Sequence, residues 1–359
     1  MSLPVRGPVP AARRAGTLPG VEHLGCVGLP GSGHDGLFRA LTGLEVTGAA
    51  DRVVGVVTVP DERLDALARL SSSRRVVHAT FEVAYLPPLS PQAGTGLGSR
   101  LLGSIRNADA LCVVVSALGG ADPAAELAAI EEELILADLA SVEARLAKQR
   151  RAAKGDPSLA AEVEALEAAE AALSDGLPVH RSGLDDRRRR LLAPAFLLTD
   201  TPTLVVVNVD PDRLGDPSVV ERFGPGAMAV CIELESDPEV VGSPPEERAA
   251  LLAELGVPEP VVPRLARAAL GLLGRAVFFT TGEKESRAWT FRVGASAPEC
   301  AGVIHSDLQR GFIRAEVIHW DELVEIGSWA KAKELGRVRV EGKEYRVRDG
   351  DVLEIRFNV

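Results

Sequence analysis

The stretch Gly28-Leu-Pro-Gly-Ser-Gly33 decides the fold of this chain. It follows a short apolar run at residues 21–27 and leads into a helical pattern in which Leu37, Phe38 and Leu41 recur. A buried strand, a glycine-rich turn and a helix in this order begin many α/β nucleotide-binding folds, and the stretch matches the G-x-x-x-x-G half of a phosphate-binding P-loop. Because it does not match G-x-G-x-x-G, a dinucleotide site is the weaker interpretation.

The two residues after this loop, His34 and Asp35, depart from the motif. A P-loop continues with Lys, which neutralises the β- and γ-phosphates, and with Ser or Thr, which coordinates Mg²⁺. Only six of the 40 basic residues are lysines, the first at position 148, but a preference for arginine would predict Arg at position 34 and not His. Relative to Lys-Ser, the pair removes about two units of positive charge, which weakens phosphate binding by roughly 2 to 8 kcal/mol.

Further strands are predicted on both sides of an inserted segment. Short apolar runs at 53–59, 76–83, 111–116, 203–209 and 227–232 alternate with helical patterns. This alternation predicts an α/β domain with a mostly parallel sheet and helices on both faces. A C-terminal segment, 275–359, has several short strand patterns, including 345–347, with turn residues between them, and predicts a small α+β domain.

The inserted segment, residues 122–195, is rich in Ala, Glu and Leu. Asp122-Pro123 is a helix start, and apolar residues then recur at helical spacing to a break at Gly155. This predicts an antiparallel helical hairpin whose first helix is roughly 48 Å long. All five basic residues between 122 and 175 lie just before the break: Arg145, Lys148, Arg150, Arg151 and Lys154. They are either ordinary helix-end charge or a probe for RNA phosphates.

The composition excludes several classes of protein. The chain has 359 residues and a net charge of −11, which argues against non-specific coating of nucleic acid. No apolar run approaches the ~20 residues of a membrane helix, and residues 1–20, which lack the apolar core of a secretory signal, are predicted to be a disordered tail on a cytoplasmic protein. The spacing of the four cysteines fits neither a disulfide framework nor a zinc site, and we expect buried thiols. No metal cluster or nucleophile-base spacing is visible.

Several strings resemble the YchF / Obg-like ATPase family, from about residue 21 to the end. The most specific are Val303-Ile-His-Ser-Asp-Leu-Gln-Arg-Gly-Phe-Ile-Arg-Ala-Glu-Val-Ile318 and Asp349-Gly-Asp-Val-Leu-Glu-Ile-Arg-Phe-Asn-Val359. The resemblance implies a translation-factor-class P-loop domain at 21–121 and 196–274, a helical arm at 122–195, and a β-grasp TGS domain at 275–359. It also implies binding of ATP with Mg²⁺ and association with ribosomes.

Departures from the family pattern are concentrated at the nucleotide motifs. Where the family has Asp-x-Ala-Gly, this chain has Glu82-Val-Ala-Tyr85. Of the family's base-reading motif Asn-x-x-Glu, only the asparagine is kept, as Asn208. The candidate nucleotide-binding residues are Gly28, Gly31, Ser32, Gly33, His34, Asp35, Gly36 and Asn208. No metal ligand is predicted, since Asp35 and Glu82 would serve only if a Mg-nucleotide binds.

We therefore expect a non-hydrolysing protein that binds the ribosome or another RNA, without DNA specificity or a membrane, and in which nucleotide binding is weakened or lost. One alternative is an active ATPase in which His34 is protonated on binding. The other is a protein–protein regulator with no RNA role.

Overall fold

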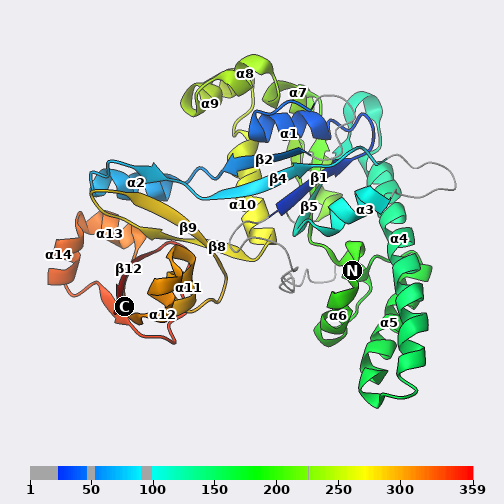
Figure 1. Cartoon of the computed structure of the whole chain (residues 1–359). Helices are drawn as coiled ribbons and strands as arrows, with labels where there is room; N and C mark the ends of the chain where they lie inside the picture. Colours follow the sequence, from blue (N-terminus) through cyan, green and yellow to red (C-terminus); the bar gives the residue numbers. More distant parts are fainter. Residues whose placement is uncertain (1–22, 47–52, 90–98, 225, 359) are drawn as a thin grey trace. The chain divides into compact units, whose positions relative to one another are not determined.

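The computed structural model describes residues 23–46, 53–89, 99–224 and 226–358, whose helices and strands are labelled in Figure 1. These residues form two compact units. The first contains the described residues of 23–56 and 82–264, and the second contains 57–81 and 265–358. Segment 57–81 therefore belongs to the unit of the C-terminal strands, although no sequence pattern separates it from the strands on either side.

The sheet of the first unit has six strands. Their order is β2 (Val53–Thr58), β4 (Thr80–Tyr85), β1 (His23–Gly28), β5 (Ala110–Ser116), β6 (Thr203–Asn208) and β7 (Met228–Val230). From β4 to β7 every neighbouring pair is parallel. The α/β fold with a mostly parallel sheet is thus confirmed. The predicted strand at 76–83 is divided, because Val76–Val77 forms β3 in the second unit and β4 begins only at Thr80.

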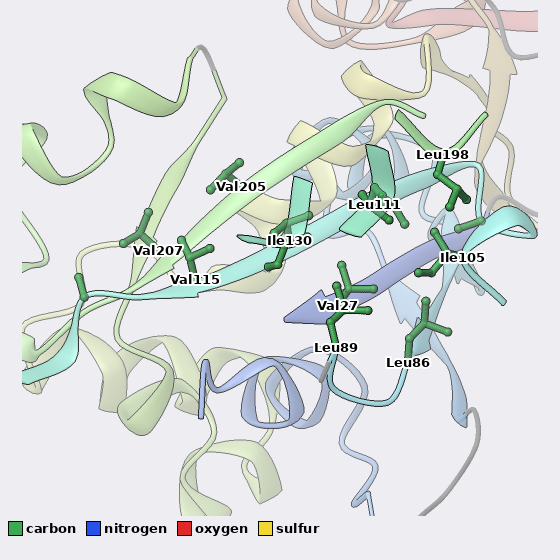
Figure 2. Close-up of a cluster of buried hydrophobic side chains, with 14 of the residues drawn as sticks. Val27, Leu86, Leu89, Ile105, Leu111, Val115, Ile130, Leu198, Val205 and Val207 are labelled. Carbon is green, nitrogen blue, oxygen red and sulfur yellow. The ribbon is translucent and has the colours of Figure 1, made fainter. Parts of the chain in front are cut away.

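One hydrophobic cluster of this unit lies on one face of the sheet, between β1, β5 and β6 and the elements that cover them (Figure 2). All seven residues of β5 are buried, as expected for a central parallel strand. Val27, Leu111 and Val205 pack there with Ile105 of α3 (Ser99–Arg106) and Ile130 of α4. This packing fixes the carboxyl ends of β1 and β6, from which the glycine-rich loop and Asn208 project.

Helices complete the first unit. They are α1 (His34–Thr42), α3, α4 (Pro123–Ala152), α5 (Ala160–Ser174), α6 (Asp186–Leu192), α7 (Ile232–Glu235), α8 (Pro238–Gly242), α9 (Pro245–Glu254) and the start of α10 (Val261–Leu272). Asp122 caps α4 by accepting a 3.0 Å hydrogen bond from the Ala124 backbone N–H. The chain turns after α4 and returns as α5 (Figure 1), and both helices share a core with the segment around α6. Helix α6 has no counterpart among the elements expected from periodicity.

The second unit has its own six-stranded sheet. Its order is β11 (Arg339–Glu341), β10 (Phe312–His319), β12 (Asp351–Phe357), β8 (Arg275–Thr280), β9 (Ser286–Arg292) and β3 (Val76–Val77). Its helices are α2 (Glu62–Leu70), the remainder of α10 from Leu265, α11 (Ala297–Ile304), α12 (Ser306–Arg310), α13 (Trp320–Ile326) and α14 (Trp329–Glu334). The strand predicted at 345–347 is wrong, because that segment makes only one isolated bridge, between Arg346 and Ser296.

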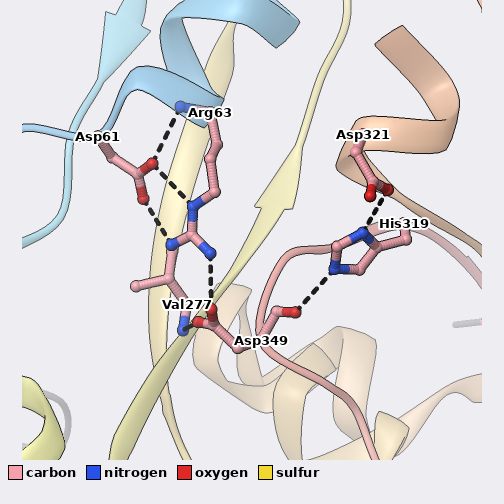
Figure 3. Close-up of polar contacts among 6 residues, drawn as sticks. All are labelled: Asp61, Arg63, Val277, His319, Asp321 and Asp349. Carbon is pink, nitrogen blue, oxygen red and sulfur yellow. Dashed lines mark hydrogen bonds and ion pairs between the residues drawn. The ribbon is translucent and has the colours of Figure 1, made fainter. Parts of the chain in front are cut away.

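Polar contacts fasten α2 to the C-terminal strands within this unit (Figure 3). Arg63 donates to Asp61 at 2.9 Å and to Asp349 at 2.6 Å, and the Val277 backbone N–H donates to the same Asp349 carboxylate at 2.8 Å. The guanidinium also lies 5.2 Å from the centre of the Phe279 ring. The carboxylates of Asp61 and Asp349 hold the pKa of Arg63 above its ordinary value. Residues 57–81 are therefore part of this unit's structure.

Candidate functional site

The glycine-rich loop joins β1 to α1 by a tight turn. Gly31 and Gly33 have φ values of 85° and 87°, in the left-handed region that favours glycine. The Ser32 backbone N–H donates to the Leu29 carbonyl at 3.1 Å, and the Leu37 N–H donates to the Gly33 carbonyl at 2.9 Å, which starts the helix. A strand, a turn and a helix N-terminus are thus arranged as in an anion-binding loop.

Close contacts leave no room for side chains at two further glycines. A Cβ on Gly28 would lie 2.1 Å from the Ser32 hydroxyl oxygen, and one on Gly36 would lie 2.7 Å from Ile232. The Ser32 side chain is buried against Gly28 and is not directed to solvent. The span of the loop between Gly28 and Gly33 is therefore filled in part by its own serine.

Asn208, at the end of β6, holds this loop in place. Its side-chain N–H donates to the Ser32 carbonyl at 3.1 Å, and its side-chain oxygen accepts from the Ile232 backbone N–H at 3.3 Å. The amide is buried, and a Cβ on Gly33 would lie only 2.6 Å from its nitrogen. Both polar atoms of the amide are therefore engaged in joining the loop to β6 and α7.

His34, the first residue of α1, is buried. Only 3% of it is exposed, and its ring stacks on Tyr85 with centroids 5.1 Å apart and planes 4° from parallel. A 3.1 Å hydrogen bond joins Nδ1 to the Ser32 hydroxyl, while Nε2 is buried with no hydrogen-bond partner of ordinary geometry. Burial lowers the pKa of His34, and the Asp35 carboxylate and Leu86 carbonyl oppose that effect without reversing it. The ring is therefore neutral at pH 7.

Asp35 is the exposed charge at this site. It lies in the first turn of α1, whose N-cap, Gly33, offers no side chain to the free N–H groups. A carboxylate there is stabilised by the helix dipole. The nearest basic residue along the chain, Arg39, is engaged elsewhere, since it pairs with Glu45 at 3.1 Å and donates to the Ser236 hydroxyl at 3.3 Å. The mouth of the loop thus carries a negative charge.

Glu82 is not brought to the loop. It opposes His23 in the register of β1 and β4, and its carboxylate lies 2.8 Å from Nδ1 of His23. His23 is the first residue of β1, whereas the loop follows its last residue, Gly28. At about 3.3 Å per residue the two ends are roughly 16 Å apart. Tyr85, which opposes Cys26, is the residue of β4 that reaches the loop.

The five basic residues near the end of α4 differ in their contacts. Arg145 donates to Glu162 at 2.6 Å and to the Pro194 carbonyl at 3.2 Å, and Arg150 donates to Glu167 at 2.9 Å. Lys148, Arg151 and Lys154 are exposed and, within the part of the chain that the structure describes, make no ion pair. Of the five basic residues near the end of α4, these three are the ones that offer an unneutralised charge to a ligand.

Two absences hold for the described ranges 23–46, 53–89, 99–224 and 226–358. No group of three or more His, Cys, Asp or Glu side chains is placed to hold a metal ion there. No helix in these ranges has the length and apolar character required to cross a bilayer.

Relatives align with this chain over nearly its whole length. Ribosome-binding ATPase YchF of Bacillus subtilis (strain 168) is 40% identical over 363 residues, covering 93% of this chain and 99% of the relative. The protein of the same name from Haemophilus influenzae is 37% identical over 360 residues, with the same coverage. This chain belongs to the YchF family.

Two further comparisons agree with membership of the YchF family. The structure of the Schizosaccharomyces pombe YchF GTPase superposes with a TM-score of 0.80 and 24% identity, covering 94% of this chain and 97% of that one, which establishes the shared fold. Residues 276–358 match the family YchF-GTPase_C, described as a protein of unknown function (DUF933). That match covers most of the C-terminal strands of the second unit.

Two features of this YchF-family chain are not predicted by sequence patterns. One is the contact between His34 and Tyr85, which lie far apart in the sequence and meet because β1 and β4 are neighbours. The other is the run Arg187-Arg-Arg-Arg190 on α6. Four consecutive basic residues are a visible signal, but only the structure shows which of them face solvent.

Proposed function

We propose that this protein is a ribosome-associated member of the YchF family whose loop holds nucleotide weakly or not at all. The first half of the proposal rests on its relatives, which are named ribosome-binding ATPases. The observation that carries the second half of the proposal is the burial of His34 against Tyr85, at the position where a P-loop has its phosphate-binding lysine.

The residues at the loop do not fit a Mg-nucleotide. His34 is neutral and buried, so it supplies no charge to the β- and γ-phosphates. Asp35 replaces the hydroxyl that would coordinate Mg²⁺ with a carboxylate that repels the phosphates. The other acid considered as a ligand, Glu82, opposes His23 at the start of β1, away from the loop. We therefore derive no hydrolytic step for this chain.

A working ATPase is the less supported function. It would require His34 to become protonated on binding, but burial lowers the pKa of this ring and so opposes protonation. It would also require the ring to leave its stack on Tyr85 before Nε2 or Nδ1 could approach a phosphate. Both steps would cost free energy, whereas a lysine at this position would require neither step.

The arm offers the contact with RNA in this proposal. Lys148, Arg151 and Lys154 are exposed near the end of α4 and are not neutralised by the acids of α5. The C-terminal unit, whose sheet and helices agree with the β-grasp TGS domain that the family resemblance implies, is the second candidate contact. Phosphate contacts made by such residues weaken as salt rises.

Co-sedimentation tests both halves together. The purified protein is pelleted with salt-washed ribosomes from Bacillus subtilis without nucleotide, with ATP and Mg²⁺, and with GTP and Mg²⁺. The proposal predicts salt-sensitive pelleting that is the same in all three conditions. No pelleting at low salt would refute ribosome association. Pelleting that changes at micromolar ATP would refute the loss of nucleotide binding.

A further inference from the structure

Helix α6 carries four consecutive arginines that divide into two pairs. Arg188 donates to Glu164 of α5 at 2.9 Å, and Arg189 donates to Asp200 at 2.8 Å. The Arg189 side chain is largely buried in its contact, whereas that of Arg188 remains 41% exposed. These two arginines are therefore structural, because they attach α6 to α5 and to the segment that leads into β6.

Arg187 and Arg190 form the other pair. Both are exposed, and neither makes an ion pair or a side-chain hydrogen bond with any residue in the ranges that the structure describes. They are three residues apart on one helix, so their side chains are neighbours on the same face. Asp186 directly precedes Arg187 and makes no ion pair with it among the described residues. The pKa of the neighbouring Asp185 carboxylate is lowered chiefly by a hydrogen bond from the Arg188 backbone N–H, at 2.8 Å, and partly by the Arg187 guanidinium.

The segment that follows α6 lies against α4. The Arg145 guanidinium reaches across to the Pro194 carbonyl, two residues after the end of α6, at 3.2 Å. Arg145 lies seven residues before the end of α4 at Ala152, so this contact is made before the hairpin turn.

We propose that Arg187 and Arg190 form a surface that binds the phosphate backbone of RNA, which we call the α6 surface. The inference rests on the proposed ribosome association and adds to it a site that is separate from the hairpin turn. Arginine suits this role because its planar guanidinium binds two phosphate oxygens at once. Its charge is available at Arg187 and Arg190 because Glu164 of α5 and Asp200 are already paired with Arg188 and Arg189.

The test compares variants of the full-length protein. Binding to salt-washed Bacillus subtilis ribosomes is measured over a series of salt concentrations for the wild type and for Arg187→Gln/Arg190→Gln. Each phosphate contact contributes about 0.7 to 0.9 to the slope of log affinity against log salt. Loss of two contacts therefore predicts a slope shallower by roughly 1.4 to 1.8. An unchanged slope would overturn the α6 surface.

Arg188→Gln/Arg189→Gln is the matched control, because it removes the same charge from adjacent positions of the same helix. We expect an unchanged slope and a lower melting temperature. Since this control could fail to fold, Arg213→Gln/Arg222→Gln instead removes two arginines of the first unit that pair with Asp216 and Asp122 and lie outside both candidate RNA contacts. If either folded control flattens the slope as much as Arg187→Gln/Arg190→Gln, net charge explains the effect and the α6 surface is refuted.

Purified ribosomal RNA in place of ribosomes identifies the partner. The α6 surface predicts that Arg187→Gln/Arg190→Gln weakens binding to both. Weaker binding to ribosomes alone would mean that a ribosomal protein is the partner, which overturns the assignment to RNA. If the wild-type protein binds no ribosomes at all, the proposed function itself fails, and that result differs from wild-type binding that the substitutions leave unchanged.

Discussion

Restoring the phosphate-binding pair should raise the affinity of this chain for nucleotide. The variant is His34→Lys/Asp35→Ser, which adds a cation at the first residue of α1 and removes an anion at the second. Two unit charges about 4 Å apart interact by roughly 1 kcal/mol in water and about 4 kcal/mol at an effective dielectric constant of 20. Asp35 is exposed, so its removal contributes near the lower value. Position 34 is buried, so the cation contributes near the upper one.

The combined gain is therefore about 5 kcal/mol, which is between 10³-fold and 10⁴-fold in affinity at roughly 1.4 kcal/mol per tenfold. The substitution has a structural cost. It removes the stack on Tyr85, worth about 0.5–1.5 kcal/mol, and the hydrogen bond to Ser32, worth a similar amount. We expect the melting temperature to fall by several degrees while ATP binding increases.

Fluorescent ATP titrated in the presence of Mg²⁺ measures the affinity, and thermal denaturation measures the cost. His34→Ala is the control for the cost, since it removes the ring without adding a cation and should lower stability without any gain in ATP binding. Asp35→Ser alone should improve binding only about 5-fold. If the double variant folds and binds ATP no better than the wild type, the electrostatic account of the loop is wrong.

Four other variants test the remaining parts of the account. Glu235 is buried, which raises its pKa to about 7, above the unfolded value of about 4.5, so its contribution to stability is present below pH 4.5 and is lost as the pH rises through 7. Glu235→Gln should therefore reduce, by about 3 kcal/mol, the loss of unfolding free energy between pH 4.5 and 8 in urea titrations; identical pH profiles would contradict the raised pKa. Lys148→Gln/Lys154→Gln should flatten the salt dependence of ribosome binding, whereas Arg145→Met, which breaks the contacts with Glu162 and Pro194, should lower the melting temperature without changing the salt slope; the reverse pattern would exclude these lysines as phosphate contacts. Arg63→Met should destabilise the protein by about 1–3 kcal/mol in chemical denaturation, because it leaves Asp61 and Asp349 without their shared cation, and an unchanged midpoint would show that segment 57–81 is held by other contacts.

The sequence was enough to predict the strand-loop-helix unit and the parallel sheet around it. These are local patterns: the apolar runs favour buried strands, and the glycines at 28, 31 and 33 permit the tight turn that follows the first of them. The long helix after Asp122 was predictable for the same reason, because its cap and its apolar spacing lie within one segment. Such features depend on residues that are close together in the chain.

The parts that were not predictable depend on pairing between distant segments. Val76 and Val77 form a strand only because they pair with Ser286 and Arg287 of β9, and two residues carry no pattern of their own. In the same way, nothing in the sequence joins His34 to Tyr85 until the register of β1 against β4 is known. The two residues that depart from the family pattern, His34 and Tyr85, then prove to stack on each other.

Charge on the arm shows the same limit. The five basic residues before Gly155 were visible in the sequence, but which of them are neutralised depends on the facing side of α5. Glu162 and Glu167 engage Arg145 and Arg150, and leave the others exposed. The available charge is therefore a property of helix packing and not of the count of basic residues.

The most direct test of the central claim is an equilibrium titration of the wild-type protein with ATP and Mg²⁺ by calorimetry, with the Bacillus subtilis relative as the positive control in the same buffer. Our account predicts binding by the relative and no saturable binding by this protein up to millimolar ATP, while the same preparation still pellets with ribosomes. Micromolar, Mg²⁺-dependent binding by the wild-type protein would contradict it.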